Sequence, residues 1–146
     1  MREYIYIIIP ITSLLLCQGL KFAIETIKYK ELRWRRLFNG TGGMPSTHTS
    51  LTFSLTFTFM YNFGMTNPIF ALSLVVSMVV AYDAMGVRME TGKQAQAINK
   101  MMKKIFAGKP TEWAKHLKEE VGHKPLEVLI GIVFAFLMST ILNNII

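Results

Sequence analysis

The sequence has little cysteine and little acidic charge. Its single cysteine, Cys17, excludes an internal disulfide framework and any zinc site built from several thiolates. Nine residues are Asp or Glu and sixteen are Lys or Arg, so the formal net charge is +7. Yet 51% of the 146 residues are hydrophobic, which is too many for a basic nucleic-acid binder or a disordered tail. Positive charge combined with this apolar content predicts a membrane protein with no nucleic-acid partner.

Four stretches are apolar and long enough to cross a bilayer as helices. Between the second and third, Gly64 to Pro68 is a turn signal short enough for a tight helical hairpin. No small-residue cleavage pattern follows the first stretch, so we interpret it as a spanning helix rather than a signal peptide. We predict an all-α fold, a polytopic membrane helical bundle of about four transmembrane helices in a single domain, residues 1–146. The predicted spans are residues 4–26, 47–64, 68–85 and 125–143.

Positive charge predicts the orientation of these spans. Five Lys or Arg residues fall between Lys28 and Met44, nine fall between Ala84 and Lys124, and the tight hairpin carries none. Basic connections of membrane proteins stay in the cytoplasm. We therefore expect both basic connections to be cytoplasmic and both chain ends to lie on the other side.

The long connection, residues 89–122, is predicted to be a cytoplasmic interfacial segment. Apolar residues at 98, 101, 102 and 105 have helical spacing with lysines between them, which is typical of a basic amphipathic helix at a membrane surface. Trp113, Leu117 and Val121 repeat every four residues and predict a second short helix that stops at Gly122. The same apolar stripes could instead pack on the protein itself, and the sequence leaves both interpretations open.

Several polar side chains lie at the ends of the predicted spans, where burying them costs free energy. The predicted topology puts them all on one side of the membrane. The Gly42-Gly43 turn before a helix exposes unpaired N–H groups and the positive end of the helix dipole, which favours an anion. Pro45 suits the first helical turn, and Ser46 or Thr47 can cap it. Lysine and arginine around this turn could bind phosphoryl oxygens. The candidate phosphate-binding residues are Lys21, Gly43, Ser46, Asp83, Arg88 and Arg36, with Arg33 and Arg35 as alternatives to Arg36.

Two histidines are candidates for the chemistry. His123 and Glu127 are four residues apart, so on a helix the carboxylate could hold one ring nitrogen and leave the other free to attack. His48, at a different helix end, could protonate a leaving oxygen. Either histidine could also be an interfacial anchor or a cap. We predict neither metal nor cofactor, because the cations expected nearby would repel a metal ion and attract an anion.

Three motifs follow one another along the chain: Gly42–His48, Asp83–Arg88 with the segment to Asn99, and Leu117–Val128. In this order they resemble the divergent branch of the phosphatidic acid phosphatase type 2 superfamily, which is related to acid phosphatases and vanadium-dependent haloperoxidases. Three residues depart from the superfamily signature, which has Gly, Ser and Asp at these positions. The departures are Thr47, Val87 and Glu127.

The resemblance implies a role for each matching residue. His123 would be the nucleophile that forms a phosphohistidine, His48 the general acid and Glu127 the residue that orients the nucleophile. Lys21 and Arg88 would bind phosphate, with hydrogen bonds from Ser46 and the Gly-Gly turn.

The sequence thus predicts a membrane phosphatase that hydrolyses a lipid phosphate, a phosphomonoester or pyrophosphate, at the cytoplasmic face of a bacterial plasma membrane. The competing hypothesis is a catalytically silent membrane protein that binds anionic lipid headgroups or scaffolds partners. The 35 residues that separate Arg88 from His123 favour this second hypothesis. Vanadate-dependent peroxidase chemistry is a third and weaker alternative. Because four short spans enclose little core, a homo-oligomer is compatible with either function.

Overall fold

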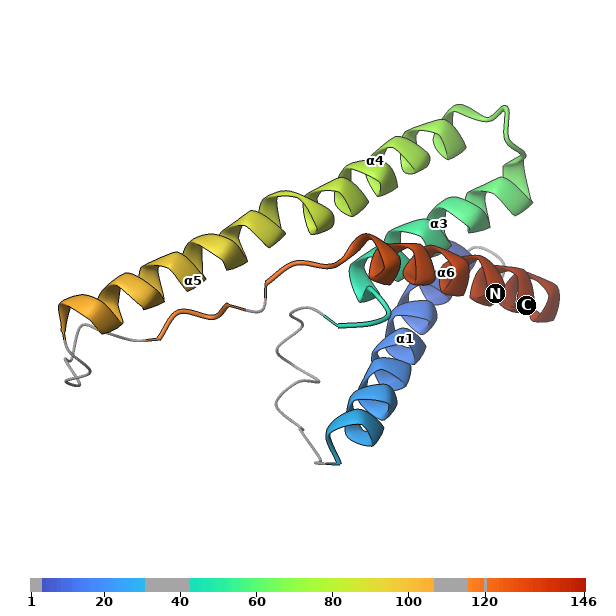
Figure 1. Cartoon of the computed structure of the whole chain (residues 1–146). Coiled ribbons are helices and arrows are strands. Elements are labelled where there is room, and N and C mark those ends of the chain that lie inside the picture. The colour runs from blue at the N-terminus through green and yellow to red at the C-terminus, as the bar shows by residue number, and fades with distance from the viewer. Residues whose placement is uncertain (1–3, 31–42, 107–115, 120) are drawn as a thin grey trace.

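The computed structural model describes residues 4–30, 43–106, 116–119 and 121–146 (Figure 1). The described residues form helices and connections and contain no strand, which confirms the predicted all-α fold. The connection that contains Arg33, Arg35 and Arg36 lies outside the described residues. The helices are α1 (Ile5–Tyr29), α3 (Thr47–Phe63), α4 (Pro68–Met85), α5 (Val87–Ile105) and α6 (Pro125–Ile145).

A helix occupies each of the four predicted spans, but they differ in length and polarity. Three segments are long and apolar enough to cross a membrane within the described part of the chain: Ile5–Lys28, Pro68–Ile105 and Pro125–Ile145. The remaining helix, α3, has 17 residues, seven of them Ser or Thr, and is about 26 Å long. That length is at the short limit for a spanning helix. The molecule is therefore a helical membrane bundle, and a fourth span at α3 stays a prediction.

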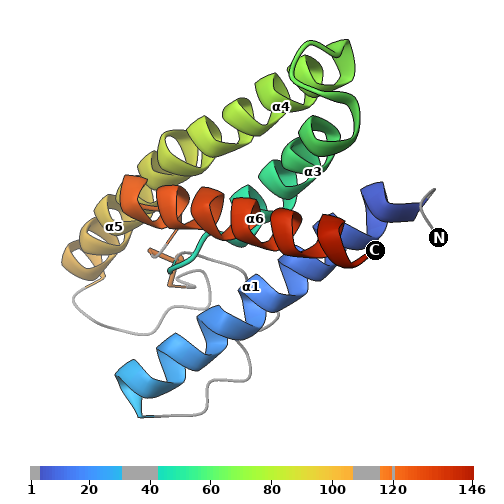
Figure 2. The same ribbon diagram turned by 90° about the vertical axis from the view of Figure 1, so that its right-hand side faces the viewer.

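The polar helix α3 lies at the centre of the bundle and packs against α1, α4 and α6 (Figures 1 and 2). Hydroxyl hydrogen bonds join it to each of these neighbours. Ser50 Oγ lies 2.8 Å from Ser13 Oγ of α1, and Thr56 Oγ1 lies 2.9 Å from Ser77 Oγ of α4. Ser139 Oγ of α6 donates to the carbonyl of Ser54 at 3.0 Å. Small hydroxyl residues allow close helix packing in lipid and link the helices through polar contacts.

The contact between α3 and α6 depends on small residues. Gly131, Ala135 and Ser139 recur every four residues along α6 and are all buried. A Cβ on Gly131 would lie 2.8 Å from the carbonyl oxygen of Ser46, so only glycine lets α6 approach the start of α3 this closely. Because the residue before α3 and the first turns of α6 carry predicted site residues, this packing determines how those residues meet.

The two ends of the bundle are distinct. At one end Tyr6 of α1 stacks on Phe59 and Phe63 of α3, with ring centroids 5.2 and 5.5 Å apart. The start of α1 and the end of α6 lie near this end (Figure 2). The opposite end holds the C-terminus of α1 and the N-termini of α3 and α6, together with the junction of α4 and α5.

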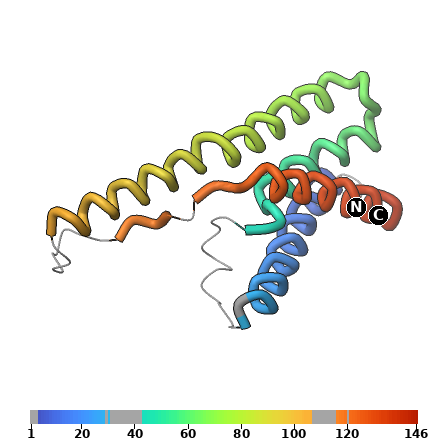
Figure 3. Tube along the Cα trace, in the orientation of Figure 1, coloured from blue at the N-terminus to red at the C-terminus, as the bar shows by residue number. Residues whose placement is uncertain are grey.

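Helix α5 continues in the direction of α4 and extends away from the other helices (Figure 3). The predicted amphipathic helix is therefore real but longer than expected, because it begins at Val87, directly after a one-residue break at Gly86. We use the term return segment for residues 116–119 and 121–124, which lead from the side of α5 back to α6. The predicted second helix ending at Gly122 is wrong in the return segment, which is not helical. Trp113 lies outside the described residues.

Candidate functional site

The N-terminus of α3 is capped by Ser46, as the sequence predicts. Its hydroxyl oxygen accepts from the backbone N–H of Thr49 at 3.4 Å and lies 2.8 Å from the Thr49 hydroxyl. Pro45 precedes this cap and is not in the first helical turn, contrary to the expectation from sequence. His48 is the second residue of α3 and is half-buried.

Gly43 brings the turn before α3 against α1. Its φ of +85° lies in the left-handed region that favours glycine. A Cβ at this position would lie 2.6 Å from Glu25 Oε1 and 3.0 Å from Lys21 Cε. Lys21 and Glu25 are both buried, which is unusual for charged side chains and typical of a functional position in a membrane protein. Sequence reasoning had not included Glu25 in the site, although its four-residue spacing from Lys21 indicates a shared helix face.

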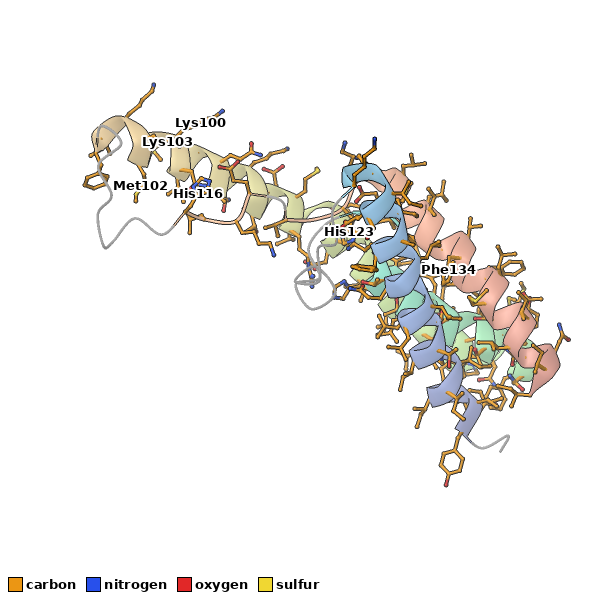
Figure 4. The ribbon with its side chains drawn as sticks, turned by 90° about the horizontal axis from the view of Figure 1, so that it is seen from below. Lys100, Met102, Lys103, His116, His123 and Phe134 are labelled. Carbon is orange, nitrogen blue, oxygen red and sulfur yellow. The ribbon has the colours of Figure 1, made fainter. Side chains whose placement is uncertain are left out.

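His123 lies where α5 meets the bundle (Figure 4). Its backbone N–H donates to the carbonyl of Ala84, near the end of α4, at 2.9 Å. Its side chain is buried, and neither ring nitrogen has a hydrogen-bond partner among the described residues. Burial, reinforced by the charges of Lys21 and Arg88 and by His48, lowers the pKa of His123 from 6.5 to about 4. The imidazole is therefore expected to be neutral at pH 7, with a proton on one nitrogen, and no described residue hydrogen-bonds either nitrogen.

The four side chains Lys21, His48, Arg88 and His123 come from α1, α3, α5 and the connection before α6, and they gather at one end of the bundle. The charges of Lys21 and Arg88 lie close enough to act on both imidazoles, and His48 acts on His123. The structure thus brings together residues that are far apart in sequence. Arg88 and His123 are far apart in sequence but come to the same end of the bundle, because α5 leads away from it and the return segment leads back.

Asp83 and Arg88 form an ion pair across the break between α4 and α5. The Nε of Arg88 donates to Asp83 Oδ2 at 2.8 Å, and both side chains are about half exposed. Asp83 therefore occupies one N–H group of this arginine and leaves the other four to further acceptors.

Glu127 makes no hydrogen bond to the ring of His123. Its Oε2 instead accepts from the backbone N–H of Lys124, the N-cap residue, at 3.2 Å and so caps the start of α6. The predicted hydrogen bond from Glu127 to His123 is not formed, because His123 precedes the first helical residue, Pro125, and does not share a helix face with Glu127. Within the described ranges, no three His, Cys, Asp or Glu side chains are grouped closely enough to hold a metal ion.

The fold and the site together define a class of protein. It is a helical membrane protein with two imidazoles and two cations gathered at one end of its bundle. The model of the divergent PAP2 family matches residues 3–138, and the chain belongs to that family, which confirms the resemblance seen in the motifs. The chain is also 31% identical over 142 residues to the "Uncharacterized membrane protein YuiD" of Bacillus subtilis (strain 168), covering 90% of this chain and 89% of that protein. No solved structure matches the chain.

Proposed function

We propose that this protein is a metal-independent phosphatase that hydrolyses a lipid phosphate, a phosphomonoester or pyrophosphate, through a phosphohistidine intermediate. The observation that carries this proposal is the environment of His123. A buried, neutral imidazole with both nitrogens unbonded to described residues lies beside Lys21, Arg88 and His48. An unpartnered buried polar group is costly, and a site with this pattern of charge is suited to an anion.

The proposed reaction has two steps. A ring nitrogen of His123 attacks phosphorus in line while His48 protonates the departing oxygen, so the P–O bond breaks as the N–P bond forms. His48 then takes a proton from water, whose oxygen displaces His123 and releases inorganic phosphate. Lys21 and Arg88 stabilise the charge on the equatorial oxygens in both steps. Hydrogen-bond donors come from Ser46, Gly43 and the N-terminus of α3. Arg36, in the connection between α1 and α3, is a further candidate phosphate ligand.

The substrate class follows from the place of the site at the end of a lipid-facing bundle. Exposed apolar side chains cover the outer faces of α1, α4 and α6, so an acyl or prenyl chain could remain in the bilayer while its phosphate reaches the site. The basic connections favour a cytoplasmic site in a bacterial plasma membrane. A homo-oligomer is compatible with this proposal, because every residue that it uses belongs to one chain.

The test is release of inorganic phosphate by the purified protein in mixed micelles with phosphatidic acid or a prenyl pyrophosphate. We expect hydrolysis that persists in excess EDTA and that vanadate inhibits. We expect His123→Ala to abolish it and His116→Ala, a substitution at an exposed histidine on the return segment, to retain it. Hydrolysis that survives His123→Ala would remove the nucleophile from this mechanism.

A catalytically silent protein that binds anionic lipid headgroups is the second candidate function. The observation that favours it is the engagement of Glu127 by Lys124, which leaves His123 without an orienting carboxylate in the part of the chain that the structure describes. This candidate predicts binding to vesicles that contain phosphatidic acid, loss of that binding in Lys21→Ala, and no phosphate release from any lipid phosphate. Parallel binding and hydrolysis assays therefore separate the two functions.

A further inference from the structure

Asn99 fastens the return segment to α5 although it lies far from the anion site along the helix. Its side chain is buried, with 5% exposed, and makes three hydrogen bonds. The amide Nδ2 donates to the carbonyl of Leu117 and to Glu119 Oε1, both at 2.8 Å. The amide Oδ1 accepts from the backbone N–H of Leu117 at 3.0 Å. A single side chain thus satisfies both backbone groups of one residue, which fixes that residue against α5.

Two glycines let the return segment lie directly on the backbone of α5. A Cβ on Gly92 would lie 2.7 Å from the carbonyl oxygen of Glu119 and 3.0 Å from that of Val121. A Cβ on Gly122 would lie 2.6 Å from the backbone nitrogen of Met89, and Gly122 has a φ of +93°. These contacts leave no layer of side chains between the two segments, so their register is tightly defined.

We call the contacts of Asn99, Gly92 and Gly122 the clasp, and the segment that they hold ends at His123, the proposed nucleophile. The chain passes from Leu117, held by Asn99, through the contacts at Gly92 and Gly122 to His123. There the backbone N–H of His123 docks on the carbonyl of Ala84. The next residue, Lys124, is the N-cap of α6. His123 is therefore fixed on its C-terminal side by the start of α6 and on its N-terminal side by the contacts of Leu117 and Gly122 with α5.

We propose that Asn99 is a positioning residue that holds His123 in its buried place through the return segment. This inference rests on the proposed function for its catalytic meaning, but the clasp itself is a property of the fold. Loss of the Asn99 contacts would free Leu117 and Glu119, admit water to the site and let the imidazole of His123 move from its position. Displacement of a reacting group by about 1 Å can reduce a rate on the order of 100-fold.

The pKa of His123 reports the position of its imidazole and can be measured without any catalytic activity. Burial is the first cause of its lowered pKa, and the facing charges are Lys21 on α1, His48 on α3 and Arg88 on α5. Asp83 pairs with Arg88, and Glu127 is engaged at the start of α6. When the return segment loosens, hydration of the imidazole raises the pKa of His123 from about 4 toward 6.5. NMR titration of ¹³C-labelled histidine, assigned with His48→Gln and His116→Gln, measures this change.

The experiment compares Asn99→Ala and Asn99→Asp with Lys100→Ala, which changes an exposed neighbouring side chain that is not part of the clasp. Asn99→Asp is nearly isosteric and still accepts from Leu117, but it replaces the donor to Glu119 with a carboxylate. We expect hydrolysis of phosphatidic acid to fall about 10- to 100-fold in both Asn99 variants. We also expect a raised His123 pKa and faster hydrogen exchange at the Leu117 and His123 amides. Asn99→Asp also loses the donor to the Leu117 carbonyl. Adding Glu119→Gln to Asn99→Asp restores a hydrogen bond between positions 99 and 119 only and should recover part of each effect.

The outcomes separate the two proposals. If the wild-type protein releases no phosphate from any lipid phosphate, the proposed function fails, while titration and exchange still test the clasp. If titration and exchange in Asn99→Asp match wild type, or if they change while hydrolysis does not, the positioning role is overturned. Asn99→Asp decides the question if Asn99→Ala does not fold.

Discussion

The backbone N–H of Ser46 donates to the carbonyl oxygen of Glu127 at 3.1 Å. This hydrogen bond joins the motif that contains His48 to the motif that contains His123, although the two are separated by α3, α4 and α5. It also satisfies one of the backbone N–H groups at the start of α3. The two imidazoles are thus held together by main-chain contacts as well as by helix packing, and the first prediction concerns that packing.

Gly131→Ala should separate the starts of α3 and α6. The added Cβ would meet the carbonyl oxygen and Cβ of Ser46 at 2.8 and 3.3 Å, so we expect a loss of about 1–3 kcal/mol in stability and a marked loss of hydrolysis. Gly19→Ala on α1 is the matched control, because a Cβ there has no neighbour within 4 Å. It should leave stability unchanged or raise it by up to about 1 kcal/mol. Thermal unfolding in micelles measures both, and equal effects at the two positions would contradict this view of the interface.

The low pKa of His123 predicts a pH dependence with a defined sign. Between pH 6.5 and 4 the unfolded chain binds a proton at His123 and the folded chain does not, so stability falls as the pH falls through this window. The proposed nucleophile, His123, stays neutral over the same range, so the acid limb of kcat/KM that belongs to it should lie near pH 4. Thermal unfolding of His123→Gln should lack this dependence. An acid limb of the nucleophile near pH 6.5 would mean that His123 is hydrated in the working enzyme.

Glu127 should act chiefly as a helix cap. The side-chain carbonyl of glutamine can also accept from the Lys124 N–H, so Glu127→Gln should keep stability, whereas Glu127→Ala should lose about 1 kcal/mol. Because the carboxylate does not hydrogen-bond the His123 ring, we expect Glu127→Gln to reduce hydrolysis less than tenfold. A loss of 100-fold or more with unchanged unfolding would show that the carboxylate turns toward His123 during the reaction, as the family resemblance implies.

Arg88 and its partner should affect anion binding in opposite directions. Arg88→Gln removes charge-assisted hydrogen bonds, so the inhibition constant for vanadate should rise about 10- to 100-fold. Asp83→Asn removes a competing carboxylate and should lower that constant a few-fold. The ion pair is about half exposed, so each change should alter stability by less than about 1 kcal/mol. Vanadate inhibition that is insensitive to Arg88→Gln would exclude this arginine from the phosphate site.

The helices of the bundle were predictable because local signals and hydropathy agree on them. The span predicted at 68–85 is found as Pro68–Met85, because Asn67 accepts from the Ile69 N–H as its N-cap and proline suits the first turn. The return segment was mispredicted because tertiary contacts override its periodicity. Asn99 supplies the hydrogen bonds that Leu117 would otherwise make within a helix. Nothing in the spacing of apolar residues indicates such a partner.

The candidate site was partly predictable for a different reason. Charge and hydropathy predict the side of the membrane on which Lys21, His48, Arg88 and His123 lie, and that common side limits where they can meet. Which atoms touch is decided by backbone details, such as the start of α6 at Pro125. That start makes Glu127 a cap for Lys124 and leaves His123 outside the helix. A four-residue spacing could not distinguish these arrangements.

The many hydroxyl groups of α3 also bear on how the protein enters the bilayer during synthesis. Alone in hydrocarbon, α3 would expose Ser50, Ser54 and Thr56 to lipid and gain little from insertion. The short Gly64–Asn67 connection links it to the far more apolar α4. We therefore expect the translocon to accept α3 and α4 together as a hairpin, with α6 closing over α3 only after its own synthesis. The imidazole pair is assembled last, when the final helix arrives.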